Sequence, residues 1–189
     1  MLNQQGMTTT SPADAAVAYT IDPSHTLVEL SAKYMMFTTV KGRFTGVTGT
    51  LVHHASDNDF SSVEAEIETA TLTTADEKRD EHLRSADFLD VANFPKITFK
   101  SRLIVGSGEH YQVIGDLTIH GTTREVTLDT TFNGAGKNPW GHELVSFSAQ
   151  TEINRKDFGL NWNVALEAGG VLVSDKLKIQ LEVQAAREA

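Results

Sequence analysis

The chain has 189 residues, enough for one domain or two very small ones, and its 40% hydrophobic and 22% charged residues are typical of a globular protein. Sixteen Lys and Arg residues against 25 Asp and Glu residues give a net charge of −9, which argues against a nucleic-acid partner and against a polybasic membrane-surface module. The sequence contains no cysteine, and this excludes disulfides, thiolate catalysis and Cys-type zinc sites. No stretch approaches the roughly 18 consecutive apolar residues of a membrane-spanning helix.

The first residues of the chain are small and polar. They contain no apolar run of the roughly 7–15 residues that a secretory signal needs. We therefore expect residues 1–17 to form a flexible tail and residues 18–186 to form the folded domain. The same observation predicts a cytoplasmic location, or a periplasmic one if a signal sequence has been removed.

From Ala18 onward, apolar and polar residues alternate, which is the pattern of strands with one buried face. In residues 63–68, Val, Ala and Ile alternate strictly with three glutamates. The same period runs through residues 97–103, 111–119, 126–132, 145–153 and 177–183, and two earlier strands are expected near residues 26–32 and 41–54. The pattern therefore predicts about eight strands.

The residues between these strands favour antiparallel hairpins. Residues 106–108 and 120–121 contain glycines where tight turns need a positive φ. A short turn is expected around residues 34–39, and a longer loop over residues 134–141 (GAGKNPWG). Residues 74–87 are the one segment that looks helical, with Thr74 or Asp76 as its cap.

So many strands with one apolar face need a closed shape, because an open sheet would expose that face and its edges. The sequence therefore predicts an all-β fold, an extended eight-stranded antiparallel barrel with one or two short helices. Such barrels are wide enough to hold one small ligand. Alternation alone leaves two interiors open, one filled with side chains and one that encloses an apolar cavity of roughly 300–1,000 Å³. If the interior is hollow, we expect its wall to include apolar residues from strands and connections: Phe37, Phe44, Ile67, Phe88, Phe99, Leu117, Ile119, Phe147, Phe158 and Trp162.

The histidines suggest catalytic or metal-binding roles, but their spacing supports neither strongly. His53 and His54 are adjacent and point to opposite faces of a strand, so they cannot chelate together. His82 with Asp80 or Asp87 resembles a base with an orienting acid, yet no strained Ser or Cys nucleophile accompanies it. We predict no metal site and no catalytic residues. An enzyme acting on a small apolar substrate, with His82 or His25 as base, remains the rival hypothesis.

Two further polar residues have alternative roles. His25 follows Asp22 at a strand start, where it either donates to a neighbouring carboxylate or carbonyl or contacts the polar end of a ligand. Arg155 either clamps the loop after a strand or meets an anionic head group at the mouth of the barrel. On the predicted helix, Asp80 and Arg84 are four residues apart and can form an ion pair.

Several motifs of the chain carry a resemblance to a known family. In order, they are residues 22–26 (DPSHT), 40–44 (VKGRF), 79–90 (RDEHLRSADFLD), 94–101 (FPKITFKS), 115–123 (GDLTIHGTT), 153–162 (INRKDFGLNW) and 169–171 (GGV). With these motifs the sequence resembles the YceI family, lipocalin-like proteins that bind polyisoprenoids, from about residue 18 to residue 183. Leu89 stands where the family often has a second Phe, and many relatives are periplasmic.

The resemblance implies an extended antiparallel barrel whose interior holds a long isoprenoid chain, in a homodimeric carrier with no established catalytic step. We therefore expect a soluble protein that binds a long isoprenoid of polyprenyl or quinone type, or a similar lipid, and that requires no cofactor. Burial of the chain at about 0.8 kcal/mol per methylene makes such capture favourable without a charged partner. The alternatives are the His-dependent enzyme and a filled barrel that serves as an interaction module.

Overall fold

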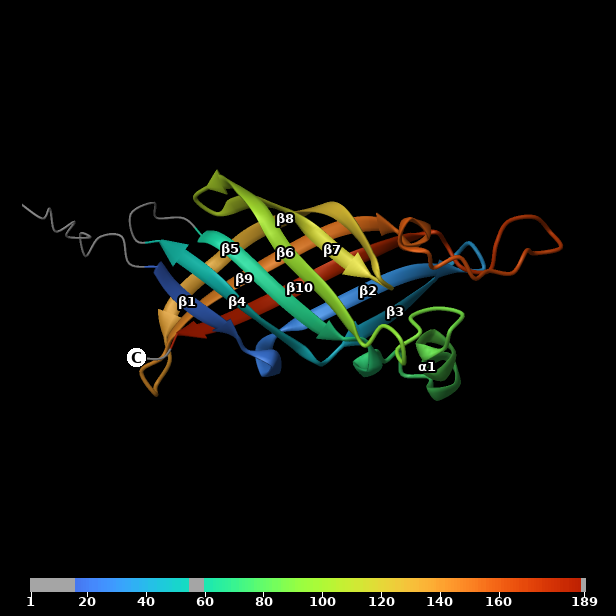
Figure 1. Ribbon diagram of the computed structural model, residues 1–189, viewed down its shortest axis with the longest axis horizontal. Coiled ribbons are helices and arrows are strands. Elements are labelled where there is room, and N and C mark those ends of the chain that lie inside the picture. Colours follow the sequence, from blue (N-terminus) through green and yellow to red (C-terminus); the bar gives the residue numbers. More distant parts are fainter. Residues whose placement is uncertain (1–15, 55–59, 188–189) are drawn as a thin grey trace, which may run out of the picture.

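Figure 1 shows the computed structural model of the chain, which describes residues 16–54 and 60–187. Residues 1–15 of the predicted tail lie outside this range, whereas Ala16 and Val17 already belong to the first strand. The strands are β1 (Ala16–Ile21), β2 (Leu27–Tyr34), β3 (Thr38–Phe44), β4 (Val47–His54), β5 (Phe60–Glu68), β6 (Lys96–Ser107), β7 (His110–Ile119), β8 (Thr122–Lys137), β9 (Glu143–Asn154) and β10 (Lys176–Arg187). The helical elements are α1 (Glu77–Arg84) and the short 3₁₀ turns η2 (Pro23–His25), η3 (Thr69–Thr71) and η4 (Arg155–Phe158).

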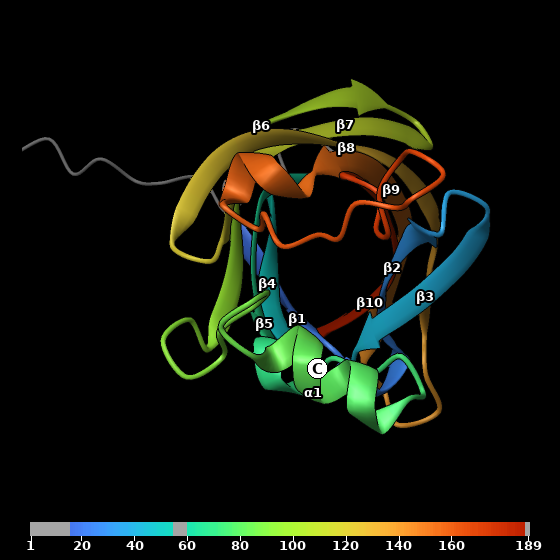
Figure 2. The ribbon, with the colours of Figure 1, turned by 90° about the vertical axis from the view of Figure 1, so that its right-hand side faces the viewer.

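Neighbouring strands pair in antiparallel fashion and close into a barrel. The ring runs through β1, β4, β5, β6, β7, β8, β9 and β10, and it closes because β10 also pairs with β1. This confirms the predicted eight-stranded antiparallel barrel. Two further strands extend it: β2 pairs with another part of β10, and β3 pairs with β2. Figure 2 looks into the barrel from the end at which these two strands lie.

The added strands arise because two long strands are interrupted. β1 and β2 lie end to end along β10, with η2 between them, and Pro23 in η2 has no N–H to donate to a ladder. The strand predicted over residues 41–54 is divided into β3 and β4 at Thr45 and Gly46. A Cβ on Gly46 would lie 2.8 Å from Thr71 Cγ2, so the absence of a side chain permits the close approach of η3 at this interruption.

This interruption changes the wall of the barrel. β4 pairs with β5, but β3 instead meets the segment that follows β5, through a bridge between Arg43 and Thr73 with N–O distances of 2.9 Å in both directions. Gly42 is buried there, and a Cβ on it would lie 3.1 Å from Thr74 and 3.2 Å from Leu72. Residues 69–90, including α1, therefore complete the wall where β3 and β5 diverge (Figure 2).

The helix is shorter than predicted. Asp76 is its cap, because its carboxylate accepts a hydrogen bond from the Arg79 backbone N–H at 3.0 Å. Thr74, the alternative cap, is held outside the helix by the Asp80 carboxylate, which accepts from its N–H at 2.7 Å. The helix ends at Arg84, and residues 85–87 return in a turn instead of extending it.

The predicted loop over residues 134–141 is wrong for its first half. β8 continues to Lys137 and pairs with β9, and an irregularity in the register near Gly134 absorbs the extra residue. Glycine permits the φ of 142° at this position, so here it allows a bulge instead of ending the strand. The loop itself is only residues 138–142, where the Asn138 side chain accepts from the N–H groups of Trp140 and His142.

The polar side of the alternation faces outward. On β5, Glu64 pairs with Lys100 at 2.7 Å and Glu66 pairs with Lys96, both across the β5–β6 ladder. A turn at residues 120–121 connects β7 to β8 as predicted, whereas the turn between β6 and β7 lies at residues 108–109, because β6 continues through Ser107. Residues 35–37 form the turn between β2 and β3. In the part of the chain that the structure describes, no helix has the length and hydropathy to cross a membrane.

Candidate functional site

The interior of the barrel is hollow. Inward residues of the strands, together with side chains from residues 72–89 and 155–173, enclose a cavity of about 320 Å³. This volume lies in the range of roughly 300–1,000 Å³ that is usual for ligand pockets. The structure therefore favours an enclosed cavity over an interior filled with side chains.

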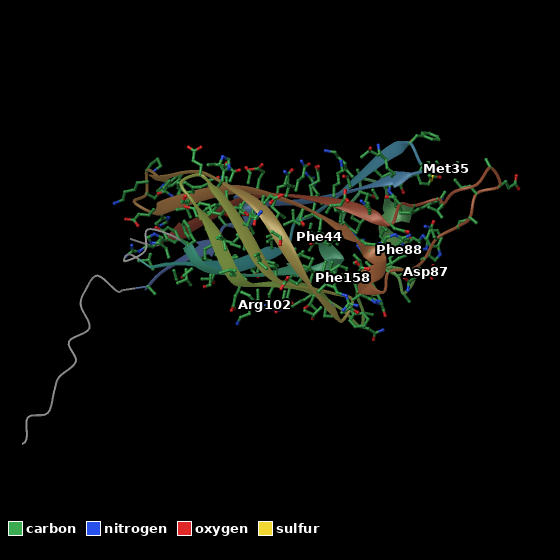
Figure 3. All side chains as sticks on the ribbon, turned by 90° about the horizontal axis from the view of Figure 1, so that it is seen from above. Met35, Phe44, Asp87, Phe88, Arg102 and Phe158 are labelled. Atoms are coloured by element: carbon green, nitrogen blue, oxygen red, sulfur yellow. The ribbon has the colours of Figure 1, made fainter. Side chains whose placement is uncertain are left out.

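The lining is almost entirely apolar. It includes these predicted pocket residues: Phe44, Ile67, Phe88, Phe99, Leu117, Ile119 and Phe147. Figure 3 shows Phe44 inside the barrel and Arg102 on its outside. Because side chains alternate across a strand, every second residue of a long strand faces the cavity, and each long strand contributes several lining side chains along the length of the barrel. The wall is therefore a continuous apolar surface suited to an elongated apolar molecule.

The structure places the other predicted pocket residues outside this lining. Phe158 is 1% exposed and packs in the core. Trp162 packs edge-on against His82, with ring centroids 4.7 Å apart, and also against Phe88 at 5.1 Å. Phe37 is 75% exposed in the turn between β2 and β3. These aromatic rings come from connections, where the alternation of a strand gives no information on direction.

Some residues that line the cavity lie outside the strands, so the alternation of apolar and polar residues does not predict them. Leu72, Leu83 and Leu89 line the cavity from the segment that fills the gap between β3 and β5. Leu83 is the one apolar residue of α1. A single apolar residue on an otherwise polar helix indicates the face that packs against the protein. Leu72 and Leu89 lie in irregular chain, and only the contact of this segment with the barrel turns them inward.

The two ends of the cavity differ. At one end, Phe147 packs edge-on against Phe60 at a centroid distance of 4.9 Å and is tilted against Phe132 at 5.3 Å, while the ring centroid of Tyr19 lies 6.2 Å from that of Phe60. We call these four residues the aromatic end. The opposite end is formed by the β2–β3 turn, α1 and residues 155–175, and we call it the mouth end (Figures 1 and 2).

Arg155 organises the mouth end from inside. It is only 2% exposed, and it also belongs to the cavity lining. Its Nη1 donates to the carbonyls of Leu160 and Trp162 at 2.7 and 2.8 Å, and its Nε donates to the carbonyl of Ser174 at 3.0 Å. One guanidinium thus ties together three points of the loop that follows η4.

The remaining nitrogen of Arg155 is paired only loosely. Its Nη2 lies 3.5 Å from Asp175 Oδ1, and neither atom has a hydrogen-bond partner among the residues that the structure describes. Burial lowers the pKa of the Arg155 guanidinium, and the charge of Asp175 opposes that shift. Asp175 also pairs with Lys156 at 3.0 Å through its other oxygen. Arg155 is therefore a clamp of the mouth loop, which is one of the two roles that the sequence left open.

His25, the other predicted mouth residue, lies on η2. Its side chain is 64% exposed, and its Nδ1 is 2.7 Å from Asp22 Oδ2. It is not among the residues that line the cavity. The contact with Asp22 corresponds to the carboxylate partner expected for it.

These features agree with what comparison with known proteins shows. A family model described as a YceI-like domain matches residues 19–185. The chain belongs to the YceI family. A UPF0312 protein of Staphylococcus aureus (strain N315) is 36% identical over 173 residues, which are 88% of this chain and 95% of that protein. A UPF0312 protein of Pseudomonas putida (strain W619) is 34% identical over 176 residues, covering 92% of this chain and 88% of that one.

Solved structures share the YceI fold. BcnA of Burkholderia cenocepacia superposes with a TM-score of 0.73 at 22% identity, covering 87% of this chain and 99% of that chain. The YceI protein of Campylobacter jejuni gives 0.72 at 26% identity, with 83% and 90% covered. A polyisoprenoid binding domain from Saccharophagus degradans, implicated in plant cell wall breakdown, gives 0.65 at 14% identity, with 91% and 99% covered.

Within this YceI fold, the charged motif on α1 acts mainly on structure. Burial raises the pKa of the Asp80 carboxyl, but hydrogen bonds from Thr74 and Thr73 outweigh that effect and hold the pKa below its usual range. Arg84 donates to the carbonyl of Leu72 at 2.6 Å and influences Asp80 only through its charge. The direct Asp80–Arg84 ion pair expected from the helical spacing is therefore replaced by contacts with the segment that fills the wall.

The histidine of this motif has an acidic partner, as the rival enzyme hypothesis requires. His82 Nε2 lies 2.8 Å from Asp87 Oδ2, and both side chains are about half exposed. The imidazole packs against Phe88 and Trp162, but His82 itself does not line the cavity. Among the residues that the structure describes, no group of three His, Cys, Asp or Glu side chains is placed to hold a metal ion. The His82–Asp87 pair is therefore better placed to stabilise the wall of the mouth end than to contact a ligand in the barrel.

Proposed function

We propose that the protein is a carrier that holds the chain of a long isoprenoid, of polyprenyl or quinone type, or a similar lipid, in its barrel. The observation that carries this proposal is the cavity of about 320 Å³ with its apolar wall. Membership of the YceI family supports it, as does the structural likeness to a domain described as polyisoprenoid binding. A chain of several isoprene units offers on the order of 10 kcal/mol from apolar burial before the costs of binding.

The polar end of such a lipid would stay near the mouth end. The described lining residues that carry a full charge are Lys33, Arg79 and Arg155. Arg79 and Arg155 belong to elements of the mouth end, and Lys33, near the end of β2, reaches the β2–β3 turn, where its Nζ donates to the Phe37 carbonyl at 3.4 Å. The strand interior offers only weakly polar hydroxyls, such as those of Thr130 and Thr151. A lipid that enters chain first would therefore place its head group where water and charge are available.

Mass spectrometry of an organic extract of the purified protein tests this proposal. We expect a co-purified lipid, or uptake of a polyprenyl alcohol by protein that has been stripped and refolded. Lipid-free protein that takes up neither a polyprenyl alcohol nor a quinone with a long side chain would contradict it. Sedimentation equilibrium of the same sample tests the homodimer that we propose from the family resemblance.

Paired substitutions on β6 locate the bound chain. Phe99→Glu places a charge in the lining and should abolish capture, whereas Leu103→Glu adds the same charge to an outward side chain that is 53% exposed. Phe99→Trp is a second variant, which narrows the cavity without a charge and should weaken capture. If folded variants at Phe99 bind as tightly as Leu103→Glu, the lipid does not occupy this cavity.

A further inference from the structure

Two loops project from the mouth end and expose apolar side chains. One is the turn between β2 and β3, residues 34–37, and the other is residues 163–172. Together we call them the mouth tip. Tyr34, Met36, Phe37 and Val164 are 44%, 61%, 75% and 45% exposed, respectively. Both loops extend beyond the barrel in Figure 1, and Figure 3 shows Met35 at the same end as Phe88.

The turn between β2 and β3 has a backbone conformation that its residues do not favour. Met35 and Met36 have φ values of 53° and 71°, and the Phe37 N–H donates to the Tyr34 carbonyl at 3.3 Å. This is a two-residue hairpin turn with both central residues at positive φ, a position that strongly favours Asn-Gly. Large apolar residues are unfavourable here both in the backbone and in water. Such a departure at an exposed site points to a function of the side chains themselves.

Contacts between the two loops make the mouth tip one surface. The Met35 N–H donates to the Leu172 carbonyl at 2.8 Å, and Tyr34 forms a bridge with Val173. Within the second loop, the Leu172 N–H donates to the Val164 carbonyl at 2.9 Å. Tyr34 and Val173 also belong to the cavity lining. The exposed apolar surface is therefore continuous with the wall of the cavity.

The mouth tip carries almost no charge, although the chain as a whole carries −9. Residues 34–40 contain no charged side chain, and residues 163–173 contain only Glu167. A charged protein partner would find few complementary groups here, namely Glu167 and, beside the turn, the Lys33 ammonium, whose Nζ donates to the Phe37 carbonyl at 3.4 Å. An uncharged apolar phase fits it, because aromatic and aliphatic side chains at a tip gain free energy when they enter the boundary of a bilayer.

We propose that the mouth tip inserts into the surface of a lipid bilayer and so presents the mouth end of the cavity to the membrane. The choice of a bilayer as the partner rests on the proposed lipid-carrier function. A guest chain would then pass between bilayer and barrel along Tyr34 and Val173 without crossing water. Binding depends on apolar insertion instead of charge, since the acidic protein is repelled by anionic lipids.

Flotation of the full chain with vesicles of phosphatidylcholine tests the proposal. The wild-type protein should float with the vesicles, and addition of anionic phosphatidylserine should not strengthen binding. Phe37→Ser removes the most exposed ring of the mouth tip and should weaken binding on the order of tenfold. Trp140→Ser is the matched control, because Trp140 is 80% exposed in the loop between β8 and β9 at the opposite end of the barrel.

The outcomes separate this proposal from the proposed function and from its main rival. If the wild-type protein does not float, or if Trp140→Ser weakens binding as much as Phe37→Ser, the proposal is overturned. If Phe37→Ser instead converts a dimer to a monomer and no form floats, the mouth tip is an interface between two copies. If the protein floats but its organic extract contains no lipid, the result supports docking and counts against the carrier function. If the extract contains a lipid but the protein does not float, the result supports the carrier function and counts against docking.

Discussion

The aromatic cluster inside the aromatic end and the mouth tip hold aromatic residues in opposite environments. At the aromatic end, Phe60, Phe132 and Phe147 pack edge-on or tilted against one another, and Phe147 is 7% exposed. At the mouth end, Phe37 is 75% exposed on a strained turn. The first arrangement stabilises the fold, because buried rings gain both apolar burial and edge-on contacts. The second gains no such burial in the isolated protein, and this supports the proposed insertion of the mouth tip into a bilayer.

The difference follows from where the strand ring is complete. At the aromatic end, β1 and β4 complete the strand ring: β1 pairs with β4 and, at Thr20 and Ile21, with β10, and β4 pairs with β5. At the mouth end, β2 and β3 leave that ring, and irregular chain is held in place by the Asp80 carboxylate, which accepts from the Thr74 N–H, and by Arg155, which donates to the Leu160 carbonyl. The aromatic end should therefore be the more stable part, and the mouth end the part that opens at lower free energy.

The largest effect is expected from truncation at the aromatic end. Phe147→Ala should lower the free energy of unfolding by about 3–5 kcal/mol, because a buried ring leaves a cavity behind. Phe37→Ala at the mouth end is the matched change and should alter it by less than about 0.5 kcal/mol, since the ring is mostly in water. Urea unfolding of the two variants measures both values. Similar losses would refute the contrast between the ends.

A smaller loss is expected when the clamp of the mouth end is removed. Arg155→Ala leaves the carbonyls of Leu160, Trp162 and Ser174 without their donors and should cost about 2–4 kcal/mol. Hydrogen exchange should show faster exchange in residues 160–175, while amides of β9 and β10 near Phe147 keep their relative protection. Arg155→Lys keeps the positive charge but lacks the several N–H donors of the guanidinium. It should therefore recover only part of the lost free energy of unfolding. Unchanged exchange in residues 160–175 would argue against the clamp.

The turn between β1 and β2 marks the border of the two regions and predicts a dependence on pH. Hydrogen bonds from Ser24 and His25 lower the pKa of Asp22 from 3.8 to about 2. Because the folded state favours the ionised form, this stabilisation is complete above the unfolded pKa and is lost as the pH falls from about 4 to about 2.

Asp22→Ala should cost about 1 kcal/mol at neutral pH, as for loss of a capping side chain. The difference in stability between wild type and Asp22→Ala should shrink over the same acid range. Thermal unfolding of both proteins at several pH values provides the measurement. A difference that stays constant down to pH 2 would show that the carboxylate charge does not contribute.

The smallest effect is expected in the mouth tip and has the opposite sign. Replacing Met35 and Met36 with Asn and Gly should raise the free energy of unfolding by about 0.5–1 kcal/mol, because both residues then suit a positive φ. The same double variant should bind phosphatidylcholine vesicles less well than wild type. Loss of stability in the double variant would show that contacts of the methionines, such as Met36 with Gly170, outweigh the strain.

The sequence by itself determined the barrel and the direction of most strand side chains. Strict alternation, as in residues 63–68, assigns each side chain to a face, because the period of a strand is a property of the backbone alone. The turn at His120 and Gly121 followed from local chemistry in the same way. For the helix cap, the sequence offered Thr74 or Asp76, and the structure selects Asp76. The sequence also indicated Phe99 and Phe147 as inward residues, and the structure places both in the lining.

Only the tertiary structure decided what happens in the connections. The division of residues 41–54 depends on the approach of Thr71 to Gly46, and the inward position of Leu72 depends on the bridge between Arg43 and Thr73. The three carbonyls bound by Arg155, and the pairing of the β2–β3 turn with residues 163–172, join segments far apart in the chain. Local periodicity carries no information on such contacts, because they depend on which irregular segments the closed barrel brings side by side.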